Sequence, residues 1–215
     1  MSSFSFFLNL FILWAKIFYR LKIEGIENCP KEGGLVIVFN HIAPIIDGIT
    51  GGIAYNIRPD LATFGGAALP RGGIIGRYMN KQRKSESSSM LSAVKAQGLS
   101  GVELYKALKI LQKGRAISLA AEGEISWDGT LQYPLAPGAA YMALRANVPV
   151  IAFISTGGYD VMPRWSKVPK LFGKVSVRVG KPFYVHDGPI TQMTDELLNG
   201  ASDKIYQEMA GLIGA

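Results

Sequence analysis

Short, largely apolar runs recur along the chain and alternate with segments of helical periodicity. Apolar residues at consecutive positions are typical of strands buried on both faces of a sheet. Three such runs occupy residues 35–39, 116–120 and 148–154. Leu104, Leu108 and Leu111 lie at i, i+4 and i+7, which predicts a helix over 101–113 with Gly114 as its C-cap.

Weaker patterns of the same kind predict the remaining elements. They indicate strands over 20–26, 61–66 and 175–179, helices over 48–57, 70–80 and 136–146, and one or two closing helices over 191–212. Because strands and helices alternate, the sequence predicts an α/β fold with a mostly parallel central sheet flanked by helices.

The N-terminal segment 4–14 is almost wholly apolar and is followed at once by aromatic and basic residues. It is shorter than the ~20 residues of a regular spanning helix, and no cation precedes it as in a secretory signal. Trp14, Tyr19 and the nearby cations are typical of a helix that lies in a membrane interface. The alternative is a core helix that docks on the domain. We therefore expect an interfacial helix and lead-in over 1–24 and a main domain over 25–215.

The amino-acid composition and net charge limit the kinds of partner that the protein is expected to bind. The chain has 215 residues, 48% of them hydrophobic, which suits one domain with a substantial core. The net charge of +7 favours anionic partners such as lipid head groups or an acidic carrier protein. Nothing beyond that charge supports nucleic-acid binding. Residues 164–181 mix cations with aromatics, which fits a second membrane contact or a solvated loop equally well. Cys29 is the one cysteine, so no intramolecular disulfide forms.

The candidate chemistry begins where the run 35–39 ends, at Asn40-His41. In an open α/β sheet, a side chain at such a strand end points into the crevice where ligands bind. Asp47 follows six positions after His41, close enough to bond one ring nitrogen and leave the other as a base for a hydroxyl proton. The alternative is a satisfied histidine at a strand end, with an aspartate near a helix start.

A second polar strand end follows the run 116–120, in the segment Glu122-Gly123-Glu124-Ile125-Ser126. Two polar strand ends on one sheet edge converge on one crevice, although a solvated acidic turn is an equally good interpretation. We find no metal-ligand cluster, no glycine fingerprint for phosphate and no nucleophile elbow in the sequence.

Four blocks, taken in order, resemble those of the glycerolipid acyltransferases, the family that includes lysophosphatidic acid acyltransferases. The similarity spans roughly residues 20–180. The blocks are Asn40-His41 with Asp47 after the lead-in 25–30, the segment Gly76–Arg83, Glu122–Ser126 with the trailing glycines up to 138–140, and Val148-Pro149-Val150-Ile151.

The resemblance implies acyl transfer to a hydroxyl of a lysolipid or related lipophilic acceptor. His41 would be the general base and Asp47 its orienting partner. The resemblance makes Arg83 a phosphate-binding candidate and makes Glu122 and Gly123 acceptor-pocket residues. Asn40 and Ser126 join them as substrate-binding candidates. No cofactor or metal is implied, because the acyl donor is itself a substrate, either acyl-CoA or an acyl-carrier protein. We expect a membrane-associated protein, peripheral or monotopic, on the cytoplasmic face.

Three departures from the family pattern affect these expectations. Five residues instead of four separate His41 from Asp47, and in a regular helix one extra residue turns a side chain by about 100°. Pro44 disfavours a regular helix there, so we expect a bulge or turn to absorb the residue. Ala121 and Ile125 replace the proline and arginine of the third block, and the lysine ahead of the second block is missing. The alternative function is a non-catalytic lipid-binding protein that retains the fold.

Overall fold

The computed structural model describes residues 3–64 and 101–214. Its helices are α1 (Ser3–Phe18), α2 (Pro44–Ile57), α4 (Gly101–Gln112), α5 (Gly138–Ala146), α6 (Gly158–Val161) and α7 (Asp195–Ile213), with a short 3-10 helix at Ile26–Asn28. Its strands are β1 (Lys22–Glu24), β2 (Leu35–Phe39), β3 (Ala62–Phe64), β4 (Ala116–Ala120), β5 (Val150–Thr156) and β6 (Ser176–Val179).

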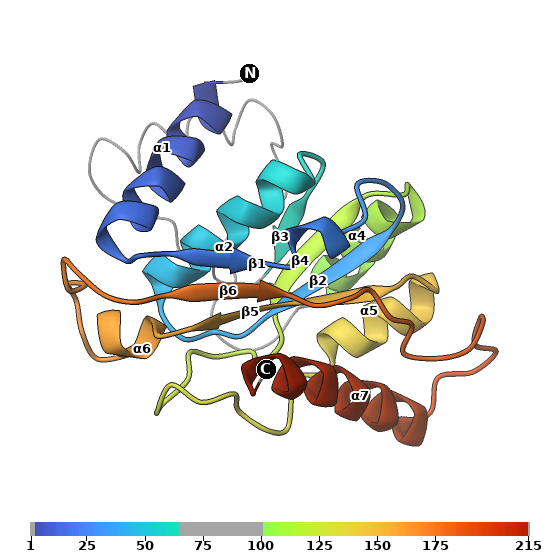
Figure 1. The fold of residues 1–215 in the computed structure, drawn as a ribbon. Coiled ribbons are helices and arrows are strands. Elements are labelled where there is room, and N and C mark those ends of the chain that lie inside the picture. The colour runs from blue at the N-terminus through green and yellow to red at the C-terminus, as the bar shows by residue number, and fades with distance from the viewer. Residues whose placement is uncertain (1–2, 65–100, 215) are drawn as a thin grey trace.

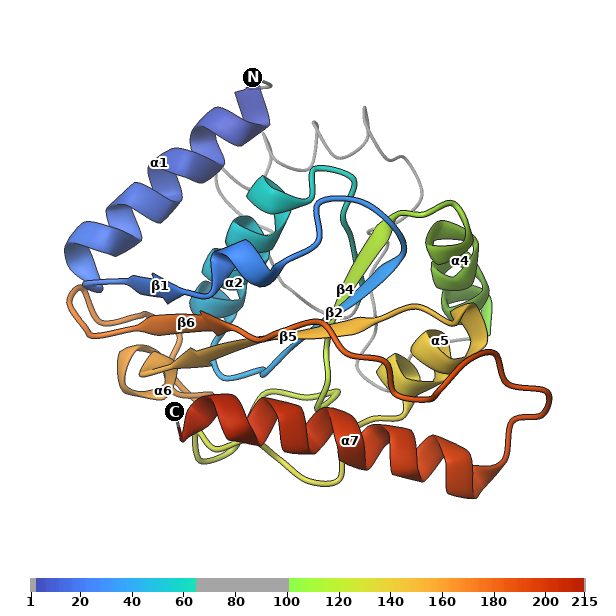
Figure 2. The same cartoon turned by 45° about the vertical axis from the view of Figure 1, so that its right-hand side comes forward.

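The strands form one sheet in the order β1-β6-β5-β2-β4-β3. Neighbouring strands are parallel except β5 and β6, which run antiparallel. Helices α1 and α2 lie over one face of the sheet, and α5 and α7 lie over the other (Figure 1). The turned view places α4 beside α5, near β4 (Figure 2). The predicted α/β fold with a mostly parallel sheet is therefore confirmed.

Strand β2 explains why its sequence is apolar at every position. Leu35, Ile37 and Phe39 point into the cluster formed with α1 and α2. Val36 and Val38 point into the cluster formed with α4, α5 and α7. Since both faces are covered, all five residues are buried. The strand lies between β4 and β5, so it ends in the middle of the sheet.

Most predicted elements appear within a few residues of their predicted bounds, and the start of α2 differs. Helix α2 begins at Pro44 itself, so the chain is helical from Pro44 to Asp47 and only residues 41–43 form the expected non-helical turn. Proline fits the first helical position because no intrahelical partner exists for its missing N–H. The closing segment is one helix, α7, capped by Thr194, whose side chain accepts from the Leu197 N–H. The helix predicted over 70–80 lies outside the described residues.

Helix α1 is apolar on two opposite sides. Leu8, Ile12 and Ala15 are buried in the cluster shared with α2. A second row is 49 to 65% exposed and comprises Phe6, Phe7, Leu10, Leu13 and Ile17. No helix in the described ranges is both long and apolar enough to cross a bilayer.

The two aromatic residues assigned to an interface have different surroundings. Trp14 is half-buried and stacks between Phe11 and Phe18. Tyr19 is fully buried and its hydroxyl donates to the Lys170 carbonyl at 3.1 Å, so its assignment to a membrane interface is wrong. The division of the chain at residue 24 stays a prediction.

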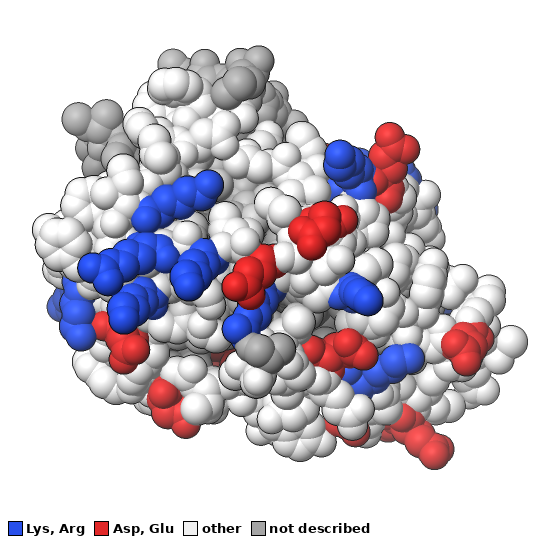
Figure 3. All heavy atoms as spheres, in the orientation of Figure 1, with Lys and Arg blue, Asp and Glu red and all other residues white. Residues whose placement is uncertain are grey.

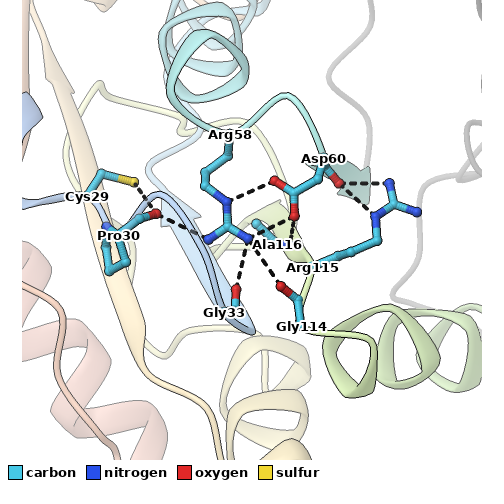
Figure 4. A network of polar contacts seen from close by, with 8 residues as sticks. All are labelled: Cys29, Pro30, Gly33, Arg58, Asp60, Gly114, Arg115 and Ala116. Carbon is cyan, nitrogen blue, oxygen red and sulfur yellow. Dashed lines mark hydrogen bonds and ion pairs between the residues drawn. The ribbon is translucent and has the colours of Figure 1, made fainter.

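A buried arginine holds together the sheet edge opposite His41 (Figure 4). The Arg58 side chain has no exposed surface. Its guanidinium donates to both carboxylate oxygens of Asp60 at 2.8 Å, and also to the backbone carbonyls of Pro30, Gly33 and Gly114. These groups precede β2, β3 and β4, so one cation fixes the entry of three adjacent strands.

Asp60 completes this network. It accepts the Ala116 N–H at 3.2 Å, and its carbonyl accepts from Arg115. The hydrogen bond from Arg58 holds the pKa of Asp60 below its usual range. Cys29 lies next to the network, and burial raises the pKa of its thiol to about 11. A thiol with that pKa is protonated at neutral pH and is a poor nucleophile.

Candidate active site

Three adjacent strands bring polar residues to one edge of the sheet. Asn40 and His41 follow β2, Glu122 follows β4, and Ser155 lies near the end of β5. Strands β4, β2 and β5 are parallel neighbours, so their carboxyl ends share an edge. All four residues are buried. The predicted convergence of the two polar strand ends is therefore present in the structure.

His41 and Asp47 are in direct contact at this edge. Nδ1 of His41 lies 2.7 Å from Oδ2 of Asp47, and both side chains are nearly inaccessible to solvent. When Asp47 is ionised, it accepts a hydrogen bond from the Nδ1–H tautomer of His41, which leaves the ring lone pair on Nε2. No described residue forms a hydrogen bond with Nε2. In that tautomer, Nε2 is the nitrogen that can accept a proton from an incoming group.

The electrostatics of Asp47 combine opposing effects. Burial raises the pKa of its carboxyl, while the hydrogen bond and charge of His41 lower that pKa. Asp47 also lies in the first turn of α2, where the helix dipole favours a negative charge. Oδ1 of Asp47 and Oγ1 of Thr50 are buried, and neither has a hydrogen-bond partner among the described residues.

The extra residue between His41 and Asp47 is absorbed before α2 begins. Ala43 is extended, with φ −156° and ψ 136°, and acts as the N-cap. The helical rotation of about 100° per residue therefore applies only from Pro44 onward. Residues 41–43 are not helical and bend at Ile42, and His41 contacts Asp47 in the first turn of α2.

The backbone of His41 is held on both sides by the segment after β4. Its N–H donates to Oε2 of Glu122, and its carbonyl accepts from the Ser126 N–H at 2.7 Å. Oε1 of Glu122 accepts from the Gln132 N–H at 2.8 Å. Both carboxylate oxygens of Glu122 are thus bonded within the protein. Burial raises the pKa of Glu122, and the two N–H donors lower it.

Asn40 extends the pairing of β2 with β5 by one residue. Its side-chain amide donates to the Ser155 carbonyl at 2.8 Å. Its side-chain oxygen accepts from the Ser155 N–H at 2.8 Å and from the Ser155 hydroxyl at 3.1 Å. The side chain therefore substitutes for a strand neighbour and fixes the position where His41 leaves the sheet.

Ser126 and Gly123 shape the loop beside His41. The Ser126 hydroxyl is fully buried, donates to the Thr130 carbonyl at 2.8 Å and accepts from the Gly129 N–H at 2.9 Å. Gly123 has φ +80°, a left-handed conformation that a residue with a Cβ rarely adopts. This turn lets the chain reverse directly after Glu122.

The structure brings together six of the seven candidates. His41 and Asp47 are in contact, and Asn40, Glu122, Gly123 and Ser126 surround them. Arg83 and the whole second block lie outside the described residues. Sequence reasoning missed Ser155 and Gln132, and it placed Arg164 only within a basic stretch. Polar residues at the carboxyl ends of parallel strands are candidates for a ligand site, and the same rule applied to β5 indicates Ser155 and the segment after it.

The geometry places an imidazole against a carboxylate at the ligand-binding edge of an α/β sheet, an arrangement typical of enzymes that remove a proton from their substrate. The family model described as Acyltransferase matches residues 20–156, and the chain belongs to this family. The family resemblance of the four blocks is thereby confirmed.

Two relatives refine this membership. The chain is 29% identical over 209 residues to a chloroplastic 1-acyl-sn-glycerol-3-phosphate acyltransferase, LPAT1, from Arabidopsis thaliana. That alignment covers 92% of this chain but 52% of LPAT1, so the chain spans about half the length of this curated relative. The crystal structure of the 1-acyl-sn-glycerophosphate acyltransferase PlsC from Thermotoga maritima has the same fold, with a TM-score of 0.62. The structural alignment covers 95% of this chain and 79% of the PlsC chain, and the two sequences are 18% identical.

Proposed function

We propose that this protein is an O-acyltransferase that moves a fatty acyl group from a thioester donor to the hydroxyl of a lysolipid or related lipophilic acceptor. The observation that carries the proposal is the buried contact of 2.7 Å between His41 Nδ1 and Asp47 Oδ2, which leaves Nε2 open for a proton. Membership of the acyltransferase family supports the same reaction class. LPAT1 and PlsC are named for acylation of a phosphorylated glycerol lipid.

The proposed reaction begins when Nε2 of His41 accepts the proton of the acceptor hydroxyl. The acceptor oxygen attacks the thioester carbonyl and forms a tetrahedral intermediate. Asp47 stays ionised and stabilises the imidazolium through its bond to Nδ1. The intermediate then collapses to an ester, and the departing thiolate takes the proton back from Nε2. The products are one ester and one free thiol, and His41 returns to its starting state.

The residues around the pair position it. The Glu122 carboxylate and the Ser126 N–H bond the backbone of His41, and the Asn40 side chain bonds Ser155. We therefore assign these three residues to positioning the base. This assignment differs from the substrate-binding role implied by the family resemblance. The donor is acyl-CoA or an acyl-carrier protein, and Arg83 remains a proposed phosphate-binding residue of the acceptor site.

We also propose that α1 lies on a membrane surface. Its outer row of exposed apolar residues is continued by the loop 165–172, since Phe18 and Phe172 stack at 5.7 Å between ring centres. That loop exposes Trp165, Val168, Leu171 and Phe172, each by more than half. Basic side chains gather where α1, β1 and β6 meet (Figure 3), among them the exposed Lys16, Arg20, Lys22 and Lys174. Apolar side chains beside cations suit an anionic membrane.

The central experiment measures ester formation from labelled acyl-CoA or acyl-carrier protein with a panel of lysolipids and simple alcohols, read by mass. His41→Ala should lower turnover by ~10²–10⁴-fold with an unchanged fold. His186→Ala is the matched control, because His186 is the other histidine, lies in an exposed turn and bonds the Gly188 carbonyl. Equal turnover of His41→Ala and wild type would refute the proposal. Lipid binding without turnover by the wild type would favour the non-catalytic alternative.

Membrane binding is tested by substitution on the exposed row of α1. Its other face belongs to the core, and deleting the helix would therefore disturb folding. The triple variant Leu10→Ser, Leu13→Ser, Ile17→Ser should reduce sedimentation with anionic liposomes and leave the thermal midpoint nearly unchanged. Undiminished binding would assign the contact to the loop 165–172 instead.

A further inference from the structure

Arg164 is held in a fixed position beside the loop that follows β4. Its Nη1 donates to the Ile125 carbonyl at 2.6 Å and to Oε2 of Glu124 at 3.1 Å. Its guanidinium carbon lies 3.7 Å from the centre of the Trp127 ring. Stacking and two hydrogen bonds thus preorganise a cation on a side chain that is 29% exposed.

This cation lies at the same sheet edge as His41. The Ser126 N–H, one residue from the carbonyl that Arg164 binds, donates to the His41 carbonyl. The segment that leads from β5 to Arg164 also packs there, since a Cβ at Gly158 would lie 2.9 Å from Ile46. The Tyr159 hydroxyl donates to the Trp127 carbonyl at 3.3 Å and closes the contact between the two segments.

The guanidinium retains donors for a ligand. Both hydrogen bonds use Nη1, and Nε and Nη2 bind no other group in the described part of the chain. The Glu124 side chain is 59% exposed, and exposed ion pairs contribute little to stability. A phosphate that approached Arg164 would therefore displace this carboxylate at small cost. The planar fork of arginine matches two oxygens of a phosphate, which makes such contacts strong and directional.

We infer that Arg164 binds a phosphate on the acyl acceptor. Arg164 comes from the segment after β5 and contacts Ile125. Ile125 occupies the position where the third block of the acyltransferase family has arginine, so Arg164 supplies a cation beside that position. This inference rests on the proposed acyl transfer, and it makes Arg164 a residue that determines acceptor specificity. It predicts a preference for acceptors with a phosphate over neutral acceptors of the same chain length.

The test compares lysophosphatidate with a monoacylglycerol that has the same acyl chain. Arg164→Met removes the charge and keeps a long side chain over Trp127, and Arg164→Lys keeps the charge without the fork. Arg178→Met is a closely matched control. Arg178 is 28% exposed, pairs with Glu24 at 3.1 Å and donates to one carbonyl, that of Leu212.

Arg164→Met should raise the KM for lysophosphatidate at least about tenfold and leave the KM for the monoacylglycerol unchanged. Arg164→Lys should fall between wild type and Arg164→Met, and Arg178→Met should change neither KM. An equal effect on both acceptors would show a purely structural role and overturn the inference. An effect confined to the KM for acyl-CoA, or no effect on any KM, would also overturn the inference.

Calorimetric binding of lysophosphatidate to the His41→Ala protein separates this inference from the proposed function. Binding that weakens with Arg164→Met supports the phosphate contact even where the wild-type protein forms no ester. That combination of results would refute the proposed acyl transfer and support phosphate binding by Arg164. Binding that is insensitive to Arg164→Met overturns the inference whatever the turnover.

Discussion

Glu122 offers a sharp test because two roles for it predict different kinetics. The family resemblance implies contact with the acceptor, whereas the structure has both of its carboxylate oxygens bonded to the N–H groups of His41 and Gln132. Glu122→Gln keeps the size of the side chain and replaces one acceptor oxygen by an amide donor. In either orientation of that amide, one buried backbone N–H faces another donor.

The magnitude follows from the lost hydrogen bond. A buried donor left without a partner costs about 1–3 kcal/mol, so the free energy of unfolding should fall by that amount. The same change lets the His41 backbone shift, and misplacement of a catalytic group by about 1 Å costs on the order of 10²-fold in rate. We therefore expect kcat to fall about 10- to 100-fold, with the KM for the acceptor unchanged.

Urea unfolding followed by tryptophan fluorescence gives the stability, and initial rates over a range of acceptor concentrations give kcat and KM. Glu24→Gln serves as the control, because Glu24 is exposed on β1 and its Oε2 bonds Arg178. A raised KM with unchanged kcat and unchanged stability would refute the positioning role and restore contact between Glu122 and the acceptor.

Two substitutions and one labelling experiment test the site, the arginine network and the adjacent Cys29. Asp47→Asn should lower kcat by ~10²–10⁴-fold, because the neutral amide does not stabilise the imidazolium and its NH2 group can donate to Nδ1, which moves the ring proton to Nε2; equal activity at neutral pH would contradict the pair. Arg58→Met should cost about 3 kcal/mol in the free energy of unfolding. Because Arg58 lowers the pKa of Asp60, the stabilisation from this ion pair is complete above the ordinary carboxyl pKa and is lost as the pH falls through the lowered pKa. The urea midpoint of Arg58→Met should therefore depend less on pH in acid than that of the wild type. Cys29 should resist iodoacetamide until the protein unfolds, as read by mass.

The sequence could predict what depends on local pattern. The largely apolar runs identified β2, β4 and β5, because strands covered on both faces bury nearly all of their side chains. The one polar residue of β4, Ser118, is buried and donates to the Thr63 hydroxyl. The strand-end rule then placed His41 and Glu122 on one edge. The buried network of Arg58 was not foreseen, since its partners are mostly backbone carbonyls from separate loops, and no side-chain pattern marks a carbonyl. Arg164 was missed for a similar reason, because it reaches the site across a turn from another segment.

The step from His41 to Asp47 shows how spacing alone misleads. A count of residues treats the whole interval as one helix, and on that basis an extra residue turns the carboxylate away by about 100°. Contact depends instead on where the helix begins. Pro44 fixes that point, because proline is favoured at the first helical position and its ring restrains Ala43 to an extended conformation. The extra residue then lies in a segment whose direction is set by hydrogen bonds to Glu122 and Ser126, both more than eighty residues away in sequence. If those bonds fix the base, a variant that weakens them should impair catalysis as Asp47→Asn does, and Glu122→Gln meets that condition without touching the imidazole or the carboxylate.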